Sequence, residues 1–401
     1  MKKTEYTISP YPAGKDFAFS IVDDTDYSFG SDIKPVYDFL HSCNLKTTKT
    51  VWVFNAQRQN AFSEELERSA HNEKWGASLE DREYLDFVKD LEIKGFEIAL
   101  HGVSAGNDER GEIIAGYEKF NEIFGYYPSM DILHAQNIEN LYCGKYKLDS
   151  TILKTLESFF CKSDYQGHIE GSKYFWGDIS KKYVRYVRLP FHEIDEINLL
   201  KINPSMPCHD PERRLVNFWY PSSNGSNYSR FMRLTRPNNI ARLVKERGTA
   251  IVYTHFANGF TENIDGTYVL KEEFKKRMSY IKNLNGWFAT ATQILDRLLT
   301  IKDVGMHILD SGLLITNVGV NNVSQLTLLG PPNQQYIDLS DTIYQSDYEG
   351  KVILNSMPRK STLLLQFNNS QKQQNISYKH ERNKIEWLNY SCSIKNKIFK
   401  R

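Results

Sequence analysis

The chain has 401 residues, with 50 lysines and arginines against 49 aspartates and glutamates, so its formal net charge is +1. This balance excludes a nucleic-acid-binding protein in our interpretation, because no excess of positive charge is available to neutralise phosphates. Apolar residues make up 40% and charged residues 25%, a globular mixture rather than a disordered or fibrous one.

No apolar run approaches the ~18 residues that a membrane span requires. The two lysines near the N-terminus precede no apolar stretch, so we expect no secretory signal. The five cysteines form no Cys-x-x-Cys pair, which predicts neither a disulfide framework nor a zinc ribbon. We therefore expect a cytoplasmic protein of a reducing compartment that binds no membrane. The cysteines are Cys43, Cys143, Cys161, Cys208 and Cys392.

Short apolar runs alternate with amphipathic helical patterns over the first three quarters of the chain. The runs predict strands over 17–22, 51–54, 96–100, 130–134, 184–189 and 250–255. The patterns between them predict helices that begin near 31, 78 and 107, and others over 150–160, around 240–244, over 271–283 and over 291–301. The span 190–235 is rich in Pro, Asn and Ser and is predicted to hold long loops.

Strands that alternate with helices predict parallel pairing through βαβ crossovers. Six to eight such units favour an α/β fold with a (β/α) barrel of seven or eight strands, and an open doubly wound sheet is the alternative. From 303 onward, alternation and turns predict a small antiparallel β domain. We thus expect a barrel domain over 1–302 and a β-rich accessory domain over 303–401, with no indication of the oligomeric state.

Chemically competent side chains recur where the predicted strands end, at Asp23-Asp24, His101, His134, Arg188 and His255. The carboxyl ends of parallel barrel strands share one mouth, where active sites lie. Two adjacent carboxylates repel each other unless a cation or proton compensates. Aspartate and histidine are also ordinary ligands of a divalent ion such as Zn²⁺. We therefore expect one cleft that contains these residues and a divalent metal ion.

The same residues carry a family resemblance. Asp23-Asp24 after a buried strand, the run FEIALHG that contains His101, Thr254-His255, and Arg188-Leu189-Pro190-Phe191 resemble motifs of the polysaccharide deacetylases. This family has a distorted seven- or eight-stranded barrel, and the resemblance covers about residues 8–300.

The resemblance implies a role for each matching residue. Asp23 would be the catalytic base, and Arg188 would orient it. Asp24 and His101 would bind the metal ion, and His255 would be the general acid. The family usually has a second ligand histidine four residues after the first, where this chain has Ala105. His134 is the first choice to complete the metal shell.

Asn107 is a second choice, although it also fits as a helix cap. Two other outcomes stay open: a metal held by fewer protein ligands plus water, or a site that has lost its metal and its hydrolysis.

These considerations predict a zinc-dependent hydrolase that removes an acyl group, in the first instance N-acetyl, from a carbohydrate. One alternative is a non-catalytic carbohydrate-binding protein on the same scaffold, which Ala105 favours. Another is a metal-free glycoside hydrolase-like barrel, in which Asp23 or Asp24 would face Glu193 across about 5–9 Å.

Overall fold

A computed structural model describes residues 6–58, 75–147 and 164–368. The helix predicted over 150–160, Cys161 and Cys392 lie outside these ranges. The described residues divide into two compact units. Most of 19–284 belongs to the first unit, whereas 6–18 and 294–368 belong to the second.

Seven parallel strands of the first unit close into a barrel, because β8 pairs with β2 as well as with β7. This confirms the predicted (β/α) barrel and excludes the open sheet. A further strand, β11 (Gly286–Phe288), lies beside β2 in the same sheet. The barrel strands are β2 (Phe17–Asp23), β3 (Thr48–Val51), β4 (Glu97–Leu100), β5 (Met130–Asp131), β6 (Tyr186–Glu193), β7 (Phe218–Asn224) and β8 (Thr249–Thr254).

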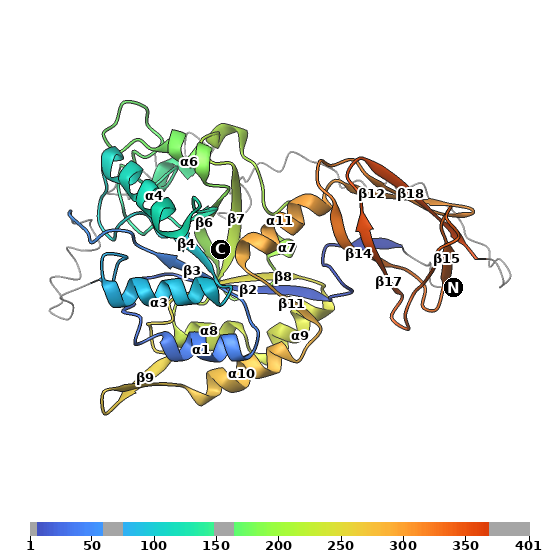
Figure 1. Cartoon of the computed structure of the whole chain (residues 1–401), viewed down its shortest axis with the longest axis horizontal. Coiled ribbons are helices and arrows are strands. Elements are labelled where there is room, and N and C mark those ends of the chain that lie inside the picture. The colour runs from blue at the N-terminus through green and yellow to red at the C-terminus, as the bar shows by residue number, and fades with distance from the viewer. Residues whose placement is uncertain (1–5, 59–74, 148–163, 369–401) are drawn as a thin grey trace. The chain divides into compact units, whose positions relative to one another are not determined.

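Helices lie around the outside of these strands (Figure 1). All seven residues of β2 are buried, as expected for a parallel strand that is covered on both faces. The helices are α1 (Lys34–Ser42), α3 (Arg82–Ile93), α4 (Arg110–Phe124), α6 (Gly177–Tyr183), α7 (Leu199–Ile202), α8 (Tyr228–Leu234), α9 (Pro237–Lys245) and α10 (Glu272–Lys282). A further helix, α11 (Ala291–Ile301), belongs for the most part to the second unit. Short 3₁₀ turns occur at η1 (Gly144–Lys147) and η2 (Pro211–Arg213).

The start of α4 differs from the prediction. Asn107 was expected to cap this helix, but the cap is Glu109, whose side chain forms a reciprocal capping box with Glu112. The Asn107 side chain instead accepts a hydrogen bond from the backbone N–H of Ile138 at 2.9 Å. Asn107 therefore ties the loop after β4 to the loop after β5 rather than satisfying the first turn of α4.

The span 190–235 holds a long connection over 203–217, as expected, but it also contains a barrel strand that was not predicted. β7 has Pro221 in its centre, a residue that sequence rules confine to strand edges. Trp219 and Tyr220 of β7 are buried at 1% and 0% exposure, so they pack in the core. A second missed feature is an antiparallel hairpin formed by β9 (Thr261–Ile264) and β10 (Thr267–Leu270).

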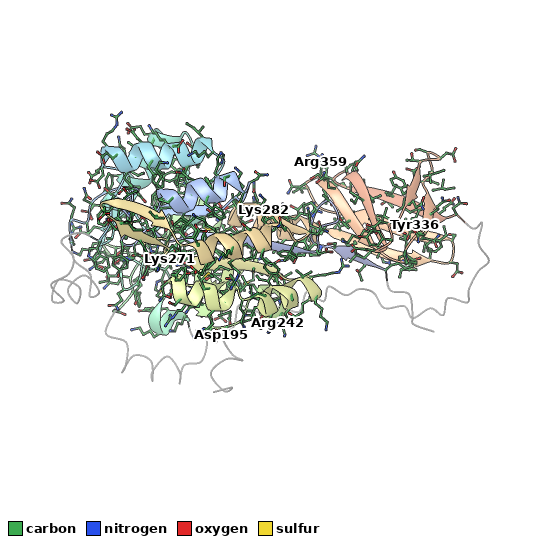
Figure 2. The ribbon with its side chains drawn as sticks, turned by 90° about the horizontal axis from the view of Figure 1, so that it is seen from below. Asp195, Arg242, Lys271, Lys282, Tyr336 and Arg359 are labelled. Carbon is green, nitrogen blue, oxygen red and sulfur yellow. The ribbon has the colours of Figure 1, made fainter. Side chains whose placement is uncertain are left out.

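The second unit contains two antiparallel sheets, in the orders β1-β14-β17 and β12-β13-β18-β15-β16. The β-rich character predicted for this part of the chain is confirmed for its described residues. Its buried core includes Leu313, Leu326 and Tyr336, the last of which is labelled in Figure 2. The boundary at 302/303 stays a prediction. The strands are β1 (Thr7–Ser9), β12 (Val304–Leu309), β13 (Gly312–Asn317), β14 (Val323–Leu329), β15 (Gln335–Ile337), β16 (Ile343–Gln345), β17 (Lys351–Met357) and β18 (Ser361–Phe367).

The cysteines depart from the sequence-based expectation. Cys43 and Cys143 are free, but Cys208 is disulfide-bonded, which a protein of a reducing compartment would not lead one to expect. Across the described ranges, no helix combines the length and the apolar character needed to cross a membrane.

Cys208 should therefore resist alkylation in denatured, unreduced protein that has been produced under oxidising conditions, and should react after reduction. Peptide mass spectrometry with iodoacetamide before reduction and a second reagent afterwards measures this. Free Cys43 is the internal control, since it should carry the first reagent. Cys208 that carries the first reagent would contradict the assignment.

Candidate metal and acid–base site

The barrel brings together five of the residues predicted from strand ends. Asp24 directly follows β2, His101 follows β4, and His255 follows β8. His134 lies three residues beyond β5, and Arg188 lies within β6. Four of the five are buried, and His255 keeps 12% of its side chain exposed. Residues more than two hundred positions apart in the sequence thus meet at one mouth of the barrel.

Asp26, which sequence reasoning missed, is the centre of this cluster. His134 Nε2 lies 2.9 Å from Asp26 Oδ1. His255 Nε2 and His101 Nε2 lie 2.8 Å and 3.2 Å from Asp26 Oδ2. Asp24 is adjacent, with Oδ2 at 3.8 Å from His101 Nε2. One carboxylate therefore faces three imidazole nitrogens.

Hydrogen bonds on the far side of two of these rings determine which imidazole nitrogen carries the hydrogen. His101 Nδ1 contacts the carbonyl of Ile132 at 2.8 Å, and His255 Nδ1 contacts the carbonyl of Ser226 at 2.8 Å. A carbonyl can only accept, so both Nδ1 atoms must carry hydrogen. In the neutral ring, Nε2 is then a bare lone pair.

Two such lone pairs directed at one carboxylate repel it unless protons or a cation lie between them. Imidazole nitrogen and carboxylate oxygen are the donor set that suits Zn²⁺ and related divalent ions. Two groups of three have ligand atoms within 4.8 Å of one another: Asp26, His101 and His134, and Asp24, Asp26 and His255. The residues present therefore fit a divalent metal ion.

Electrostatics keep both carboxylates of the cluster ionised. Burial alone would raise the pKa of Asp26, but the charges of His101 and His134 outweigh it and hold the pKa well below its ordinary value. Burial would likewise lower the pKa of His101, yet Asp24 and Asp26 raise it.

Arg188 holds Asp24 from the opposite side. Arg188 Nη1 donates to Asp24 Oδ1 at 2.9 Å and Nη2 donates to Asp24 Oδ2 at 2.6 Å, a bidentate pair that fixes the carboxylate plane. Burial would raise the pKa of Asp24, but the Arg188 charge outweighs it and lowers the pKa. The Arg188 guanidinium also lies over the ring of Tyr253, 4.5 Å from its centroid.

His255 is the most accessible of the three histidines. Burial would lower its pKa, but the hydrogen bond to Asp26 and the charges of Asp26 and Asp24 raise the pKa to about 9. These interactions favour the protonated form of His255. Its ring lies where it could give a proton to a group bound beside the cluster.

Asp23, expected as the base, lies in a different environment. Its Oδ2 accepts from Tyr37 at 2.8 Å and pairs with Lys49 Nζ at 3.0 Å. Its Oδ1 accepts from the backbone N–H of Phe256 at 2.7 Å. Both oxygens are thus occupied by protein donors. Asp23 connects β2, β3 and the loop after β8, and so supports the backbone next to His255.

Replacing Asp23 with asparagine should destabilise the protein by about 3–5 kcal/mol, because it leaves the fully buried Lys49 charge without its partner. Urea unfolding measures this. The matched control is D38N, which removes an exposed pair with Lys34 and should cost less than about 1 kcal/mol. Equal stability of D23N and the wild type would contradict the buried ion pair.

Ala105 occupies the position where a second histidine was expected, and it is buried at 3% exposure. A second histidine near Asp26 comes instead from His134, three residues beyond β5. The His101 and His134 rings lie 5.1 Å apart, centroid to centroid.

One feature of the sequence could have pointed to Asp26, namely its spacing of two residues from Asp24. In an extended segment, such spacing directs side chains to the same side.

Known proteins resemble this chain only at low sequence identity. No family model matches this chain, and no curated protein matches it. Among solved structures, a protein assigned as a polysaccharide deacetylase from Mycobacterium smegmatis shares 12% identity over 73% of this chain and 93% of that one, with a TM-score of 0.39. A peptidoglycan deacetylase from Bacillus subtilis shares 10% identity over 72% and 94%, with a TM-score of 0.35. An allantoinase shares 10% identity over 72% and 92%, with a TM-score of 0.39.

The closed parallel barrel of seven strands is the fold that the sequence resemblance to polysaccharide deacetylases led us to expect. Such likenesses do not determine chemistry, which depends on the residues of the site.

Proposed function

We propose that this protein is a metal-dependent hydrolase that removes an acyl group, in the first instance N-acetyl, from a carbohydrate. The observation that carries the proposal is the convergence of three histidine Nε2 atoms on Asp26 beside the Asp24–Arg188 pair. Asp26, His101 and His134 would hold the metal ion, with zinc the best match to these donors. This assignment moves the ligand role from Asp24 to Asp26 and the base role from Asp23 to Asp24.

The chain's own residues supply the proton transfers. A bound divalent ion would lower the pKa of a water molecule and polarise the acyl carbonyl. Asp24, held ionised by Arg188, takes a proton from the water molecule as the water oxygen bonds to the acyl carbon. His255 gives a proton to the leaving nitrogen as the carbon–nitrogen bond breaks. The products are a carboxylic acid and a free amine.

Aromatic rings beside the cluster support a carbohydrate substrate. Tyr27 stacks on Trp75 at 6.2 Å between centroids and lies 6.3 Å from His255. Tyr253 lies 5.2 Å from His255 and stacks on His192 at 4.1 Å. These side chains are partly exposed. They offer flat apolar faces next to polar groups, a surface that suits the mixed faces of a sugar ring.

The cytoplasmic location expected from the sequence has one observation against it. Disulfides persist mainly in oxidising compartments, and Cys208 is disulfide-bonded. We therefore favour an exported enzyme over a cytoplasmic one. The alkylation experiment on Cys208 also tests this preference when it is applied to protein from its native source.

Acetate release from N-acetylglucosamine oligomers tests the proposed function. We expect activity that a chelator removes and that added Zn²⁺ restores. Oligomer binding without acetate release by the zinc-loaded protein would favour the non-catalytic carbohydrate-binding alternative. Activity that survives complete metal removal would contradict the proposal.

A further inference from the structure

We propose that Asn137 is a positioning residue that holds His134 with Nε2 toward Asp26, and that Glu139 in turn holds Asn137. This inference rests on the proposed function, because His134 is taken as a metal ligand. It concerns the part of the site that stands in for the histidine missing at position 105.

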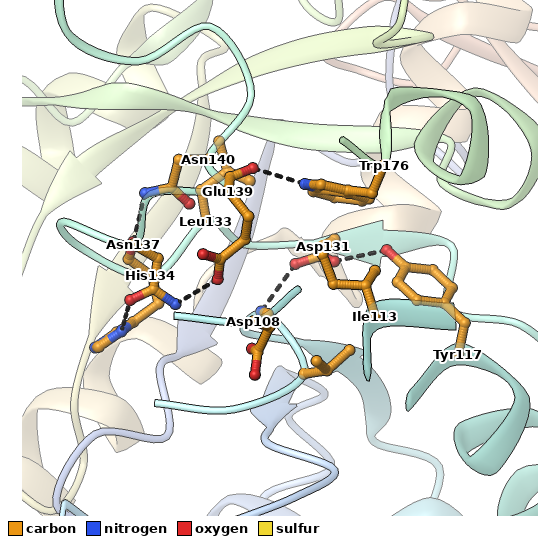
Figure 3. A pocket seen from close by; sticks show the side chains of 12 residues that line it. Asp108, Ile113, Tyr117, Asp131, Leu133, His134, Asn137, Glu139, Asn140 and Trp176 are labelled. Carbon is orange, nitrogen blue, oxygen red and sulfur yellow. Dashed lines mark hydrogen bonds between the residues drawn. The ribbon is translucent and has the colours of Figure 1, made fainter. Parts of the chain in front are cut away.

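The Asn137 amide links three groups, of which Figure 3 shows His134 and Glu139. Its Nδ2 donates to the carbonyl of Gly106 at 2.6 Å and to Glu139 Oε1 at 2.8 Å. Its Oδ1 contacts His134 Nδ1 at 3.1 Å. Since the amide nitrogen is committed to two acceptors, Oδ1 is the acceptor and His134 Nδ1 carries the hydrogen.

This arrangement selects one tautomer of His134. With hydrogen on Nδ1, neutral His134 presents its Nε2 lone pair, and Nε2 lies 2.9 Å from Asp26 Oδ1. His101 and His255 achieve the same state with backbone carbonyls. His134 uses a side chain instead, so its tautomer can be changed by a single substitution. Partners of this kind typically contribute 10–100-fold to metal affinity.

Glu139 holds Asn137 from a buried position. It is 5% exposed, and its Oε2 makes no hydrogen bond of ordinary length to the described residues. Burial, followed by the nearby charge of Asp108, raises its pKa well above the ordinary value. Burial also raises the pKa of Asp108, to about 7. A neutral Glu139 can accept from Asn137 on Oε1 while it keeps its own proton on Oε2.

A cavity of about 10 Å³ adjoins these groups and is lined in part by Asp108, Glu139, His134 and Asn137. This volume matches about one water molecule, and the lining supplies polar partners for it. Figure 3 shows Glu139 between Asn137 and Trp176, whose Nε1 donates to the Glu139 carbonyl at 2.7 Å. Backbone and side chain of Glu139 are therefore both held in place.

The test compares N137A with N239A. Asn239 is also a buried asparagine whose Nδ2 donates to a backbone carbonyl, that of Leu234, at 2.8 Å, but it lies on α9. We expect N137A to weaken Zn²⁺ binding by 10–100-fold in competition titrations with a chromogenic chelator. N239A should bind Zn²⁺ as the wild type does. Equal Zn²⁺ affinity of N137A and the wild type would overturn the inference.

Imidazole ¹⁵N shifts of the metal-free protein supply a readout that does not depend on the proposed function. The wild-type His134 ring should show Nδ1–H, and N137A should shift it toward a mixture of tautomers. An unchanged His134 spectrum in N137A would refute the positioning role. Absence of Zn²⁺ binding by the wild type would refute the proposed function alone.

The E139Q variant tests the contribution of Glu139. Glutamine keeps an acceptor for Asn137 and a donor in place of the acid proton. The Zn²⁺ affinity of E139Q should therefore stay within about twofold of the wild type. E139L offers Asn137 no acceptor and should lose Zn²⁺ affinity as N137A does. An equal loss in E139Q and E139L would overturn the role of neutral Glu139.

Discussion

Replacing Asp26 with asparagine should abolish divalent-ion binding and hydrolysis together. The variant removes the one carboxylate that all three histidines face and leaves a neutral amide in its place. We expect Zn²⁺ affinity to fall by more than about 100-fold, beyond the loss typical of partners outside the ligand shell. Competition titration and metal analysis after gel filtration measure the effect.

The control for D26N is D265N, in the turn between β9 and β10. Asp265 is exposed and has a φ of 50°, a conformation that asparagine tolerates. D265N should bind Zn²⁺ and release acetate as the wild type does. Undiminished Zn²⁺ binding by D26N would remove Asp26 from the metal site.

Replacing Asp24 with asparagine should abolish turnover while leaving the metal in place. Asparagine cannot take a proton from water, and loss of a general base typically costs 10²–10⁴-fold in rate. Since Arg188 is buried and would lose its partner, D24N should also unfold more easily. The Zn²⁺ content and circular dichroism of D24N should therefore be measured alongside kcat.

D24N and D26N together distinguish the two assignments of the carboxylates. In the arrangement described above, D26N loses the metal and D24N keeps it. The roles implied by the family resemblance predict metal loss in D24N and retention in D26N. The second pattern would return the ligand role to Asp24.

Several barrel strands could be predicted because, like β2 and β8, they are buried and read as apolar runs. β3 is polar in sequence (TKTV) and ends at Val51, where the predicted strand began. β7 was not predicted because Pro221 and two serines interrupt its apolar pattern, although Trp219 and Tyr220 are buried. In the assembled barrel, neighbouring strands and covering helices supply the burial that the local sequence does not indicate. Tertiary packing here overrides a local preference.

Part of the site could be predicted, because a residue that directly follows a barrel strand lies at the mouth of the barrel. Asp24, His101 and His255 each follow a strand directly, so their convergence follows from the barrel. Asp23 differs from Asp24 by one residue, and successive side chains of a strand point to opposite faces. The sequence alone does not say which of the pair faces the mouth. Lys49 decides this, because its fully buried ammonium needs a carboxylate partner.

The assembly of His134 with Asn137 and Glu139 was beyond sequence reasoning. His134 is 33 positions from His101, and β5 extends only over Met130–Asp131. The placement of His134 therefore depends on the loop after β5 rather than on strand geometry. That loop is held by Asn140, whose Nδ2 donates to the His134 carbonyl at 2.7 Å.

The central claim is that Asp26, His101 and His134 hold a divalent metal ion. A crystal structure of the protein grown with Zn²⁺, with anomalous data at the zinc edge, tests it most directly. We expect a peak at about 2.0–2.2 Å from an Asp26 oxygen and from Nε2 of both histidines. A zinc-saturated crystal without a peak between these three side chains would contradict the claim.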